Sequence, residues 1–199
     1  TCSAGSRLLI QEDIYDKFVG MVAEAFKKVR VGMPEMDLDC GPIVNKKQFD
    51  RVNGFIDDAI KTGVPVLAQA MIADGCPKEG YFVAPTLFGA VPRDHRLACK
   101  EVFGPVLAAM PFKDEEDAVQ LANATEYGLV SGVWTENGGL QARMAKRIQT
   151  GQAFINCYGA GGGVELPFGG MKRSGHGREK GFTALEEFST TKTVVLHHG

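Results

Sequence analysis

The chain has 199 residues, with 22 Lys and Arg against 24 Asp and Glu, and a formal net charge of −2. So small a charge gives no electrostatic reason to expect a nucleic acid or an anionic membrane surface as a partner. With 44% hydrophobic and 23% charged residues, the composition is typical of a globular protein and excludes a disordered chain.

No apolar run approaches the ~20 residues of a membrane-spanning helix, so we expect a soluble protein with no membrane partner. The cysteines are widely spaced and form no Cys-x-x-Cys pair: Cys2, Cys40, Cys76, Cys99 and Cys157. This spacing argues against a disulfide framework and a zinc site, so we expect no metal. Free thiols suit a reducing compartment, and cytoplasmic localisation is expected. The chain begins at Thr1 rather than Met, which suggests a piece of a longer protein.

The first predicted elements are a strand at 8–11 and a helix from Asp13, whose apolar face continues as far as Val29. A second helix is expected to begin at Asn45. Asn is a favoured N-cap residue, and Gln48 three positions later completes a possible capping box. Gly63 is a suitable stop for this helix.

Strands are predicted at 64–68 and 81–88. Beyond them, strands and helices alternate at regular spacing: strand 105–112, helix 114–124, strand 129–134, helix 137–148 and strand 152–157. Such alternation is typical of consecutive βαβ units. We therefore predict an α/β fold with a mainly parallel sheet and flanking helices.

The last part of the chain has a different composition. Nine glycines fall between Gly159 and Gly181, so a long irregular loop is expected there. A short helix at 178–187 and a strand at 190–196 are predicted to close the chain. The interpretation is one domain over 1–188, followed by an arm over 189–199.

The glycine clusters do not form a dinucleotide-binding motif. Val164 and Lys180 stand where the third glycine of Gly-x-Gly-x-x-Gly would be needed, and neither cluster joins a strand directly to a long helix. No phosphate-binding Gly-x-x-x-x-Gly-Lys-Ser/Thr loop is present either. A self-contained nucleotide-binding domain is therefore not expected within these residues.

Three blocks of sequence carry a family resemblance: TCSAGSR at 1–7, EVFGPV at 101–106 and LPFGGMKRSGHGREKG at 166–181. Two shorter stretches, NATEYGL at 123–129 and FINCY at 154–158, match as well. Together they resemble, in the same order, the C-terminal catalytic half of the aldehyde dehydrogenase superfamily, beginning at its nucleophilic Cys.

The resemblance implies that Cys2 is the catalytic nucleophile. A thiolate can attack an aldehyde to give a thiohemiacetal, which then gives up hydride to a nicotinamide and leaves a thioester. The small residues that follow, Ser3, Ala4 and Gly5, allow backbone N–H groups to approach a developing oxyanion. From residue type alone, an inert thiol at a chain end is the alternative.

The resemblance also implies a cofactor site for NAD or NADP. Glu101 would accept hydrogen bonds from the nicotinamide ribose, and Phe103 would lie against the nicotinamide, since an aromatic face suits a planar ring. Lys100 departs from the family, which often has an acid there. Gln48 and Arg51 match a Gln-x-x-Lys pair that reaches the cofactor in some relatives, with Arg in place of Lys. An exposed helix face explains both residues nearly as well.

Asn156 and Phe168 are expected near the substrate pocket, although Asn156 could equally tie down a strand end and Phe168 could be part of the core. The loop at 158–166 would line the entrance and select the aldehyde. Arg178 and Glu179 are expected to hold the glycine-rich segment together.

Family members carry their dinucleotide-binding domain, a water-activating Glu and an oxyanion-binding Asn before the nucleophile, outside these residues. The predicted function is therefore the catalytic half of an NAD(P)-dependent aldehyde dehydrogenase that oxidises a small-molecule aldehyde to an acid, with the 199 residues alone inactive. A CoA-acylating enzyme and a non-enzymatic assembly module are the alternatives. The strand at 190–196 would pair between subunits of a homodimer or homotetramer.

Overall fold

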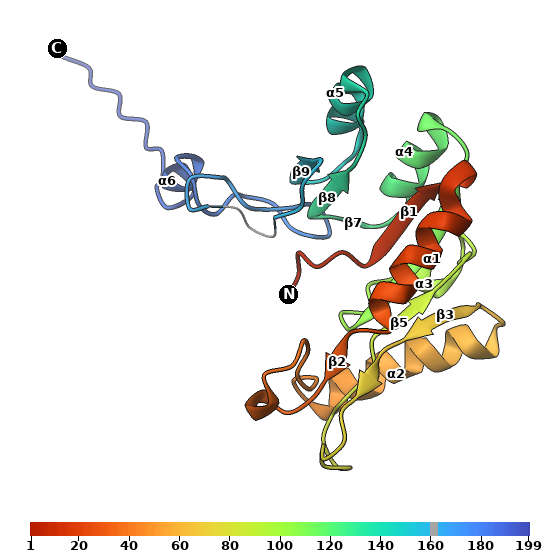
Figure 1. The fold of residues 1–199 in the computed structure, drawn as a ribbon. Coiled ribbons are helices and arrows are strands. Elements are labelled where there is room, and N and C mark those ends of the chain that lie inside the picture. The colour runs from red at the N-terminus through yellow and green to blue at the C-terminus, as the bar shows by residue number, and fades with distance from the viewer. Residues whose placement is uncertain (160–162) are drawn as a thin grey trace. The chain divides into compact units, whose positions relative to one another are not determined.

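The computed structural model describes residues 1–159 and 163–199, and the chain divides into two compact units, residues 1–125 and 126–199 (Figure 1). Each unit has its own secondary structure and is described separately below. The proposed boundary between a domain over 1–188 and an arm over 189–199 stays a prediction.

The first unit is built on a four-stranded sheet. Its strand order is β1 (Arg7–Gln11), β6 (Val106–Phe112), β5 (Thr86–Phe88) and β3 (Val66–Gln69). β6 runs parallel to both β1 and β5, and only β3 is antiparallel to its neighbour. The prediction of an α/β fold with a mainly parallel sheet is confirmed.

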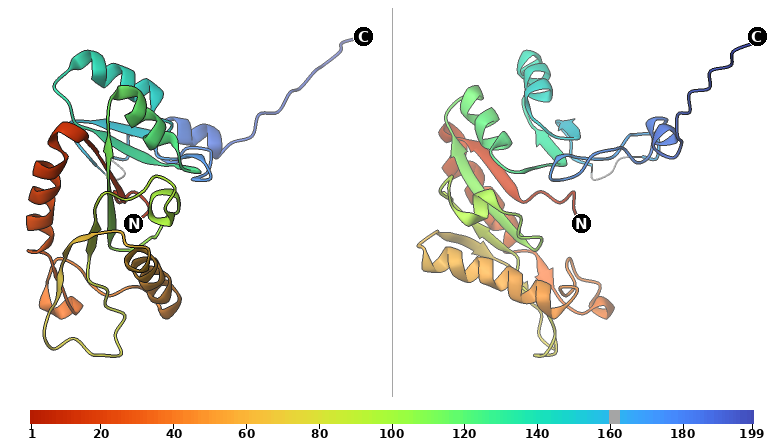
Figure 2. Two further views of the ribbon diagram at one scale, coloured as in Figure 1. Left: turned by 90° about the vertical axis from the view of Figure 1, so that its right-hand side faces the viewer. Right: turned by 180° about the vertical axis from the view of Figure 1, so that it is seen from behind.

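Helices cover both faces of this sheet, as Figure 2 shows for α1 (Tyr15–Phe26) and α2 (Lys46–Lys61). Successive residues of β6 point to opposite faces. Ala109 belongs to the apolar cluster beneath α1, whereas Ala108 and Met110 belong to the larger cluster on the other face.

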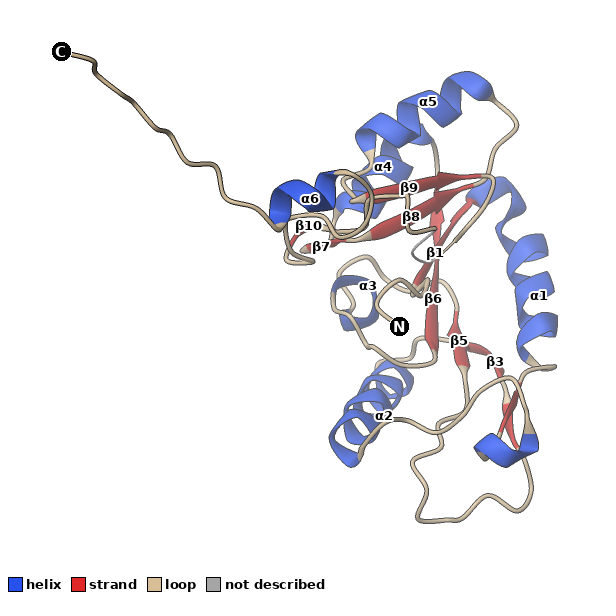
Figure 3. Cartoon of the chain, turned by 90° about the vertical axis from the view of Figure 1, so that its left-hand side faces the viewer, coloured by secondary structure: helices blue, strands red, loops and turns tan. Residues whose placement is uncertain are grey.

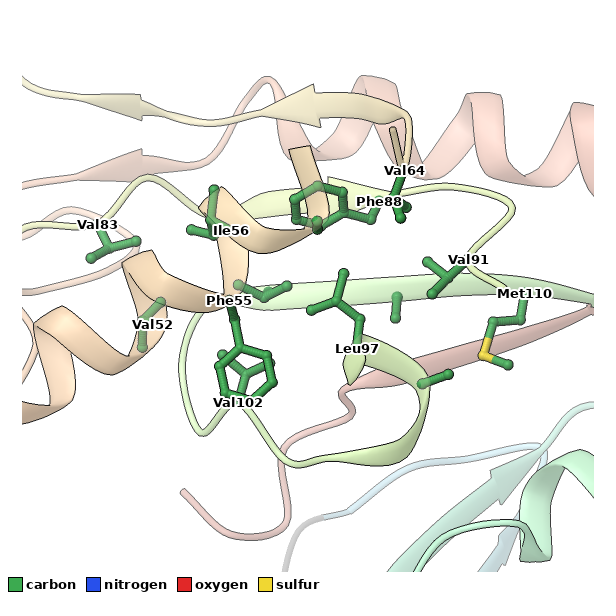
Figure 4. Packing of buried hydrophobic residues seen from close by; sticks show 14 of the residues in the cluster. Val52, Phe55, Ile56, Val64, Val83, Phe88, Val91, Leu97, Val102 and Met110 are labelled. Atoms are coloured by element: carbon green, nitrogen blue, oxygen red, sulfur yellow. The ribbon is translucent and has the colours of Figure 1, made fainter. Parts of the chain in front are cut away.

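That larger cluster also takes side chains from α2, from α3 (Arg96–Cys99) and from α4 (Glu115–Asn123), and it forms the main core of the unit (Figure 4). The helix predicted from Asn45 is confirmed, because the Asn45 side chain accepts a hydrogen bond of 2.9 Å from the Gln48 backbone N–H. Gly63 ends it with a positive φ of 82°.

Arg7 fastens β1 to the C-terminal end of α4. Its Nη1 and Nη2 donate to the carbonyls of Leu121 and Ala122, both at 2.8 Å, where a helix has unsatisfied carbonyls and partial negative charge. Burial lowers the pKa of the Arg7 guanidinium from its ordinary value.

The N-terminal end of α4 is held by an ion pair in which Arg93 Nη2 lies 2.7 Å from Asp117 Oδ2. Hydrogen bonds from Arg93 and from the Lys113 backbone N–H lower the pKa of Asp117 to about 2. α4 is therefore held at both of its ends.

Several short elements of this unit were not predicted: α3, two 3-10 turns at Glu12–Ile14 and Pro34–Met36, and the parallel pair β2 (Arg30–Val31) and β4 (Met71–Ile72). The strand predicted at 81–88 is limited to β5. The Tyr81 carbonyl accepts a hydrogen bond from the Ile43 backbone N–H at 2.7 Å, so this end of the stretch joins a loop instead of the sheet.

The second unit confirms the predicted strand–helix–strand pattern. β8 (Val130–Val133) pairs in parallel with β9 (Gln152–Ile155), and α5 (Gly138–Arg147) connects them. The short strands β7 (Tyr127–Gly128) and β10 (Met171–Lys172) pair antiparallel. An ion pair of 2.7 Å between Arg173 and Glu126 lies beside this pair.

One prediction for the end of the chain is corrected. The helix expected at 178–187 begins only at α6 (Thr183–Glu187), because Lys180 and Gly181 have φ values of 62° and 61°, outside the right-handed helical region. Within the described chain no segment pairs with 190–196, and the pairing of this stretch with a neighbouring subunit stays a prediction. No described helix is both long and apolar enough to cross a membrane.

Candidate active site

Cys2 lies in a turn directly in front of β1. The turn is closed by a hydrogen bond of 3.3 Å from the Ala4 backbone N–H to the Thr1 carbonyl. The Cys2 side chain is exposed, whereas Ser3 beside it is 5% exposed. The structure therefore presents the predicted nucleophile at the surface of the first unit.

The segment 101–105 occupies the same edge of the sheet as this turn. β1 and β6 are parallel, so the segments that precede them lie at their shared amino-terminal edge (Figure 3). The Ser6 carbonyl, just after the turn, accepts a hydrogen bond of 3.0 Å from the Ala108 backbone N–H. Two predicted site segments, far apart in sequence, are thus brought to one edge by strand pairing.

Val102 anchors the segment 101–105. It is 4% exposed and packs in the main core, whereas Phe103 is 50% exposed and has a φ of 57°. Glu101 is half-buried, and within the described part of the chain its carboxylate has no hydrogen-bond partner. The Glu101 carboxylate and the Phe103 ring therefore belong to the residues on either side of Val102, whose side chain is fixed in the core.

Gly104 permits the close approach of this segment to α2. A Cβ at Gly104 would lie 2.4 Å from Cγ2 of Val52, a fully buried residue of that helix. The glycine of the EVFGPV block thus has a packing role that the sequence pattern did not identify.

Gln48 and Arg51 contact the segment that carries Glu101 and Phe103, through its backbone carbonyls. Gln48 Nε2 donates to the Val102 and Phe103 carbonyls at 3.1 and 2.7 Å. Arg51 Nε donates to the Val102 carbonyl at 3.3 Å, and its Nη2 donates to the Glu101 carbonyl. That both residues touch the cofactor itself stays a prediction.

Asn156 is held at the end of β9 in the second unit, with a φ of 54°. Its Oδ1 accepts from the Thr135 backbone N–H at 2.8 Å, and its Nδ2 donates to the Thr135 carbonyl at 3.0 Å. These two bonds fit the alternative that Asn156 holds the end of a strand in place. A role in the pocket stays a prediction.

Phe168 is half-buried and pairs with Glu179 through two backbone hydrogen bonds of 2.7 Å. The Lys180 ammonium lies 5.6 Å from the centre of its ring. Nearby, Arg178 Nη1 donates to the carbonyls of Gly170 and Gly177 at 3.0 and 2.7 Å. Arg178 and the Glu179 backbone thus hold the glycine-rich segment together, as the sequence predicts.

The loop predicted to line the substrate entrance, 158–166, contains residues 160–162, which lie outside the described residues. At its start, Tyr158 stacks on Trp134 with ring centres 6.4 Å apart and contacts Phe154 at 5.9 Å. Burial raises the pKa of the Tyr158 hydroxyl. This aromatic group was not predicted, although its members stand near the ends of two predicted strands.

The described residues contain no group of three or more His, Cys, Asp or Glu side chains arranged to hold a metal ion. The residues of the first unit at this edge of the sheet fit the nicotinamide end of a dinucleotide better than a metal ion. A ribose would offer hydroxyl donors to the Glu101 carboxylate, which has no hydrogen-bond partner among the described residues, and a nicotinamide ring would match the exposed ring of Phe103.

Comparison with known proteins shows the family to which the chain belongs. The family model described as the aldehyde dehydrogenase family matches residues 1–194, and the chain belongs to that family. An aldehyde dehydrogenase from Emericella nidulans is 43% identical over all 199 residues. The chain spans 39% of the length of that relative.

Solved structures are similar over the same region. A putative aldehyde dehydrogenase from Burkholderia cenocepacia is 55% identical with a TM-score of 0.96, covering 100% of this chain and 42% of its own. Betaine aldehyde dehydrogenase from Staphylococcus aureus, solved in complex with NAD+, is 34% identical with a TM-score of 0.87. That match covers 94% of this chain and 38% of the other.

Proposed function

We propose that this chain supplies the nucleophile and the nicotinamide-facing wall of an NAD(P)-dependent aldehyde dehydrogenase that oxidises a small-molecule aldehyde to a carboxylic acid. The observation that carries the proposal is the meeting of two family segments at one sheet edge. The exposed Cys2 thiol precedes β1, and Glu101 and Phe103 precede β6, its parallel neighbour.

In the proposed reaction the Cys2 thiolate attacks the aldehyde carbon, and the carbonyl π electrons move to oxygen, giving a thiohemiacetal oxyanion. Reformation of the C=O bond expels hydride and leaves a thioester on Cys2. When bound, the oxidised nicotinamide supplies the hydride acceptor. Water then attacks the thioester and releases the carboxylate and the Cys2 thiolate. Aldehyde, water and NAD(P)+ thus become carboxylate, NAD(P)H and two protons.

Glu101 and Phe103 are proposed to orient the nicotinamide end of the cofactor. The carboxylate accepts hydrogen bonds from the ribose, and the ring of Phe103 packs beside the nicotinamide. The Staphylococcus aureus neighbour, described as a complex with NAD+, supports this class of cofactor. We extend it to this chain as NAD or NADP, since none of the residues assigned here distinguishes the two.

From the family resemblance, we propose that Asn156 and Phe168 are substrate-pocket residues of the intact enzyme. The two hydrogen bonds between Asn156 and the Thr135 backbone hold the end of β9 in place. The five cysteines are free thiols, which supports a reducing compartment, and we propose the cytoplasm.

The test of the proposed function is Cys2→Ser in the intact enzyme that carries these residues. We expect the rate of aldehyde-dependent NAD(P)H formation to fall by at least about 10³-fold, with cofactor affinity unchanged, because the hydroxyl is a far weaker nucleophile. Cys157→Ser is the matched control, since Cys157 is also free and exposed.

Near-normal turnover in Cys2→Ser, or equal losses in both variants, would refute Cys2 as the nucleophile. Product analysis with and without coenzyme A separates the two enzymatic alternatives, because an acylating enzyme would require coenzyme A and release a thioester. Absence of aldehyde oxidation with either cofactor would favour the assembly module.

A further inference from the structure

We propose that Asn137 is a modification site, at which the side-chain amide is lost spontaneously and an isoaspartyl residue forms. The sequence contains two Asn-Gly pairs, Asn53-Gly54 and Asn137-Gly138. An Asn-Gly pair in a flexible chain can undergo this reaction, and the structure distinguishes the two pairs. The inference concerns the start of α5 and does not depend on the proposed function.

In this reaction the Gly138 backbone nitrogen attacks Cγ of Asn137. The new C–N bond closes a five-membered succinimide ring, the bond from Cγ to Nδ2 breaks, and the side-chain NH2 group leaves as ammonia with the proton of the Gly138 amide. Water then opens the ring at one of its two carbonyls. Opening at Cγ gives Asp, and opening at the main-chain carbonyl gives isoaspartate, in which the chain runs through Cβ and Cγ. Water is the only reagent consumed.

Gly138 presents its backbone N–H without a competing acceptor. It is the first residue of α5, where N–H groups have no acceptor within the helix, and no described residue accepts a hydrogen bond from it. Gly138 is exposed, and a Cβ added to it would find nothing within 4 Å. The space through which its nitrogen approaches Cγ of Asn137 is therefore open, and glycine has no side chain to obstruct the approach.

The exposed Asn137 side chain has its amide nitrogen available to leave. Oδ1 accepts a hydrogen bond of 3.0 Å from the Leu140 backbone N–H, whereas Nδ2 has no hydrogen-bond partner in the described part of the chain. Negative charge moves onto Oδ1 during the attack, and the Leu140 N–H already points at that atom. This hydrogen bond therefore stabilises the tetrahedral intermediate.

Asn53-Gly54 is an internal comparison. Both residues lie inside α2, where the Gly54 N–H donates to a carbonyl one turn earlier. Nδ2 of Asn53 donates to the Phe49 carbonyl at 3.1 Å, and Asn53 is half-buried beside the fully buried Val52. The reaction at Asn53 therefore requires that α2 first open locally.

Isoaspartate at position 137 is expected to loosen the start of α5. The Asn137 backbone N–H donates to Thr135 Oγ1 at 3.3 Å, and Gln141 Nε2 donates to the Thr135 carbonyl at 2.7 Å. Asp keeps a capping oxygen near the Leu140 N–H, since Asp is a favoured N-cap residue. Isoaspartate adds a carbon to the main chain and so displaces both the capping group and the link to Thr135.

The test incubates the intact enzyme that carries these residues at physiological temperature, in neutral and in mildly alkaline buffer, and follows its peptides by mass spectrometry. A sample digested before incubation gives the background. Amide loss should be at least about tenfold faster at Asn137 than at Asn53, because α2 must open first. It should accelerate with pH, because the attacking nitrogen must lose its proton.

Isoaspartate is detected with an isoaspartyl methyltransferase and labelled S-adenosylmethionine, which should label the peptide that contains Asn137 and not the peptide that contains Asn53. Amide hydrogen exchange at the first turn of α5 should be faster in the labelled form than in fresh protein. Asn137→Asp is the matched control for the loss of the amide alone, and its exchange there should match that of fresh protein.

Gly138→Ala tests the nucleophile. Gly138 has no positive φ and open space around its Cβ position, so alanine should be accommodated. The added methyl obstructs the attack, and amide loss at Asn137 should slow by at least about tenfold.

Equal rates at Asn137 and Asn53, or persistence of both amides throughout the incubation, would overturn the proposal, and this comparison needs no variant to fold. Undiminished loss in Gly138→Ala would overturn it too, as would formation of Asp without isoaspartate, because direct hydrolysis of the amide gives Asp alone. Aldehyde oxidation enters none of these measurements, so a failure of the proposed function is distinguishable from a failure of this inference.

Discussion

Gly104 shows how one residue links the core to the candidate site. It follows Glu101, Val102 and Phe103, and its missing side chain lets the segment lie directly against Val52 of α2. Val52 is fully buried, and its β-branched side chain has one strongly preferred rotamer in a helix, so it cannot turn away. The position of Glu101 therefore depends on a helix whose own fold is set by the core.

Gly104→Ala should destabilise the protein by about 1–3 kcal/mol, because the added methyl must displace Val52 or the loop. Thermal or denaturant unfolding measures this change. Gly54→Ala is the control: Gly54 lies on the exposed side of α2 with nothing within 4 Å of the added methyl. There, helix propensity should give a gain of about 0.5–1 kcal/mol. Equal effects of the two changes would contradict the packing argument.

At the scale of elements, the regular part of the fold could be predicted because its patterns are local. β6, α4, β8, α5 and β9 all appear within a few residues of the expected bounds. Asp114 and Asn137 cap α4 and α5 through their side chains, as N-cap residues should. Hydrophobic periodicity and helix capping depend on residues that are close in sequence, so they can be recognised from the sequence alone.

The elements that were not predicted depend on partners distant in sequence. β2 and β4 are each two residues long and exist only as a pair, and the Tyr81 end of a predicted strand bonds to Ile43 instead. The candidate site likewise has features that depend on local sequence and features that depend on distant partners. Sequence blocks predict Cys2 and Glu101 as site residues, but the attachment of Gln48 to a loop more than fifty residues away could be seen only in the fold.

The end of the chain, 189–199, carries a prediction about assembly. Val194, Val195 and Leu196 are 67%, 85% and 76% exposed. The stretch 190–196 is rich in Thr and Val, which favour a strand, and the described part of the chain offers it no strand to pair with. We propose that this segment pairs with a neighbouring subunit in a homodimer or homotetramer. Deleting residues 189–199 should shift the mass of the intact enzyme toward monomer in light scattering. An unchanged mass would count against the pairing.

At the scale of the whole molecule, these 199 residues correspond to 39% of the length of the Emericella nidulans relative. Within them, the segment at Glu101 and Phe103 is suited to the nicotinamide end, and no glycine-rich dinucleotide motif precedes a long helix. We therefore propose that other parts of the intact enzyme hold the pyrophosphate and the adenosine of the cofactor.

The 199 residues purified by themselves should bind NAD and NADP with a Kd weaker than about 1 mM, since each ~1.4 kcal/mol of lost contact weakens affinity tenfold. They should show no steady aldehyde oxidation. Titration calorimetry with each dinucleotide, followed by an absorbance assay for the reduced nicotinamide, measures both properties. Micromolar affinity with sustained turnover would show that this stretch is a complete enzyme.

The central claim is that the substrate becomes covalently attached to Cys2, and mapping the acyl group tests it most directly. The intact enzyme is mixed with aldehyde and NAD(P)+, quenched in acid within the first turnover, digested and analysed by mass spectrometry. We predict an acyl group on the peptide that contains Cys2, formed only when the oxidised cofactor is present. An acyl group on Cys157, or continued turnover with Cys2 unmodified at every quench time, would contradict the assignment.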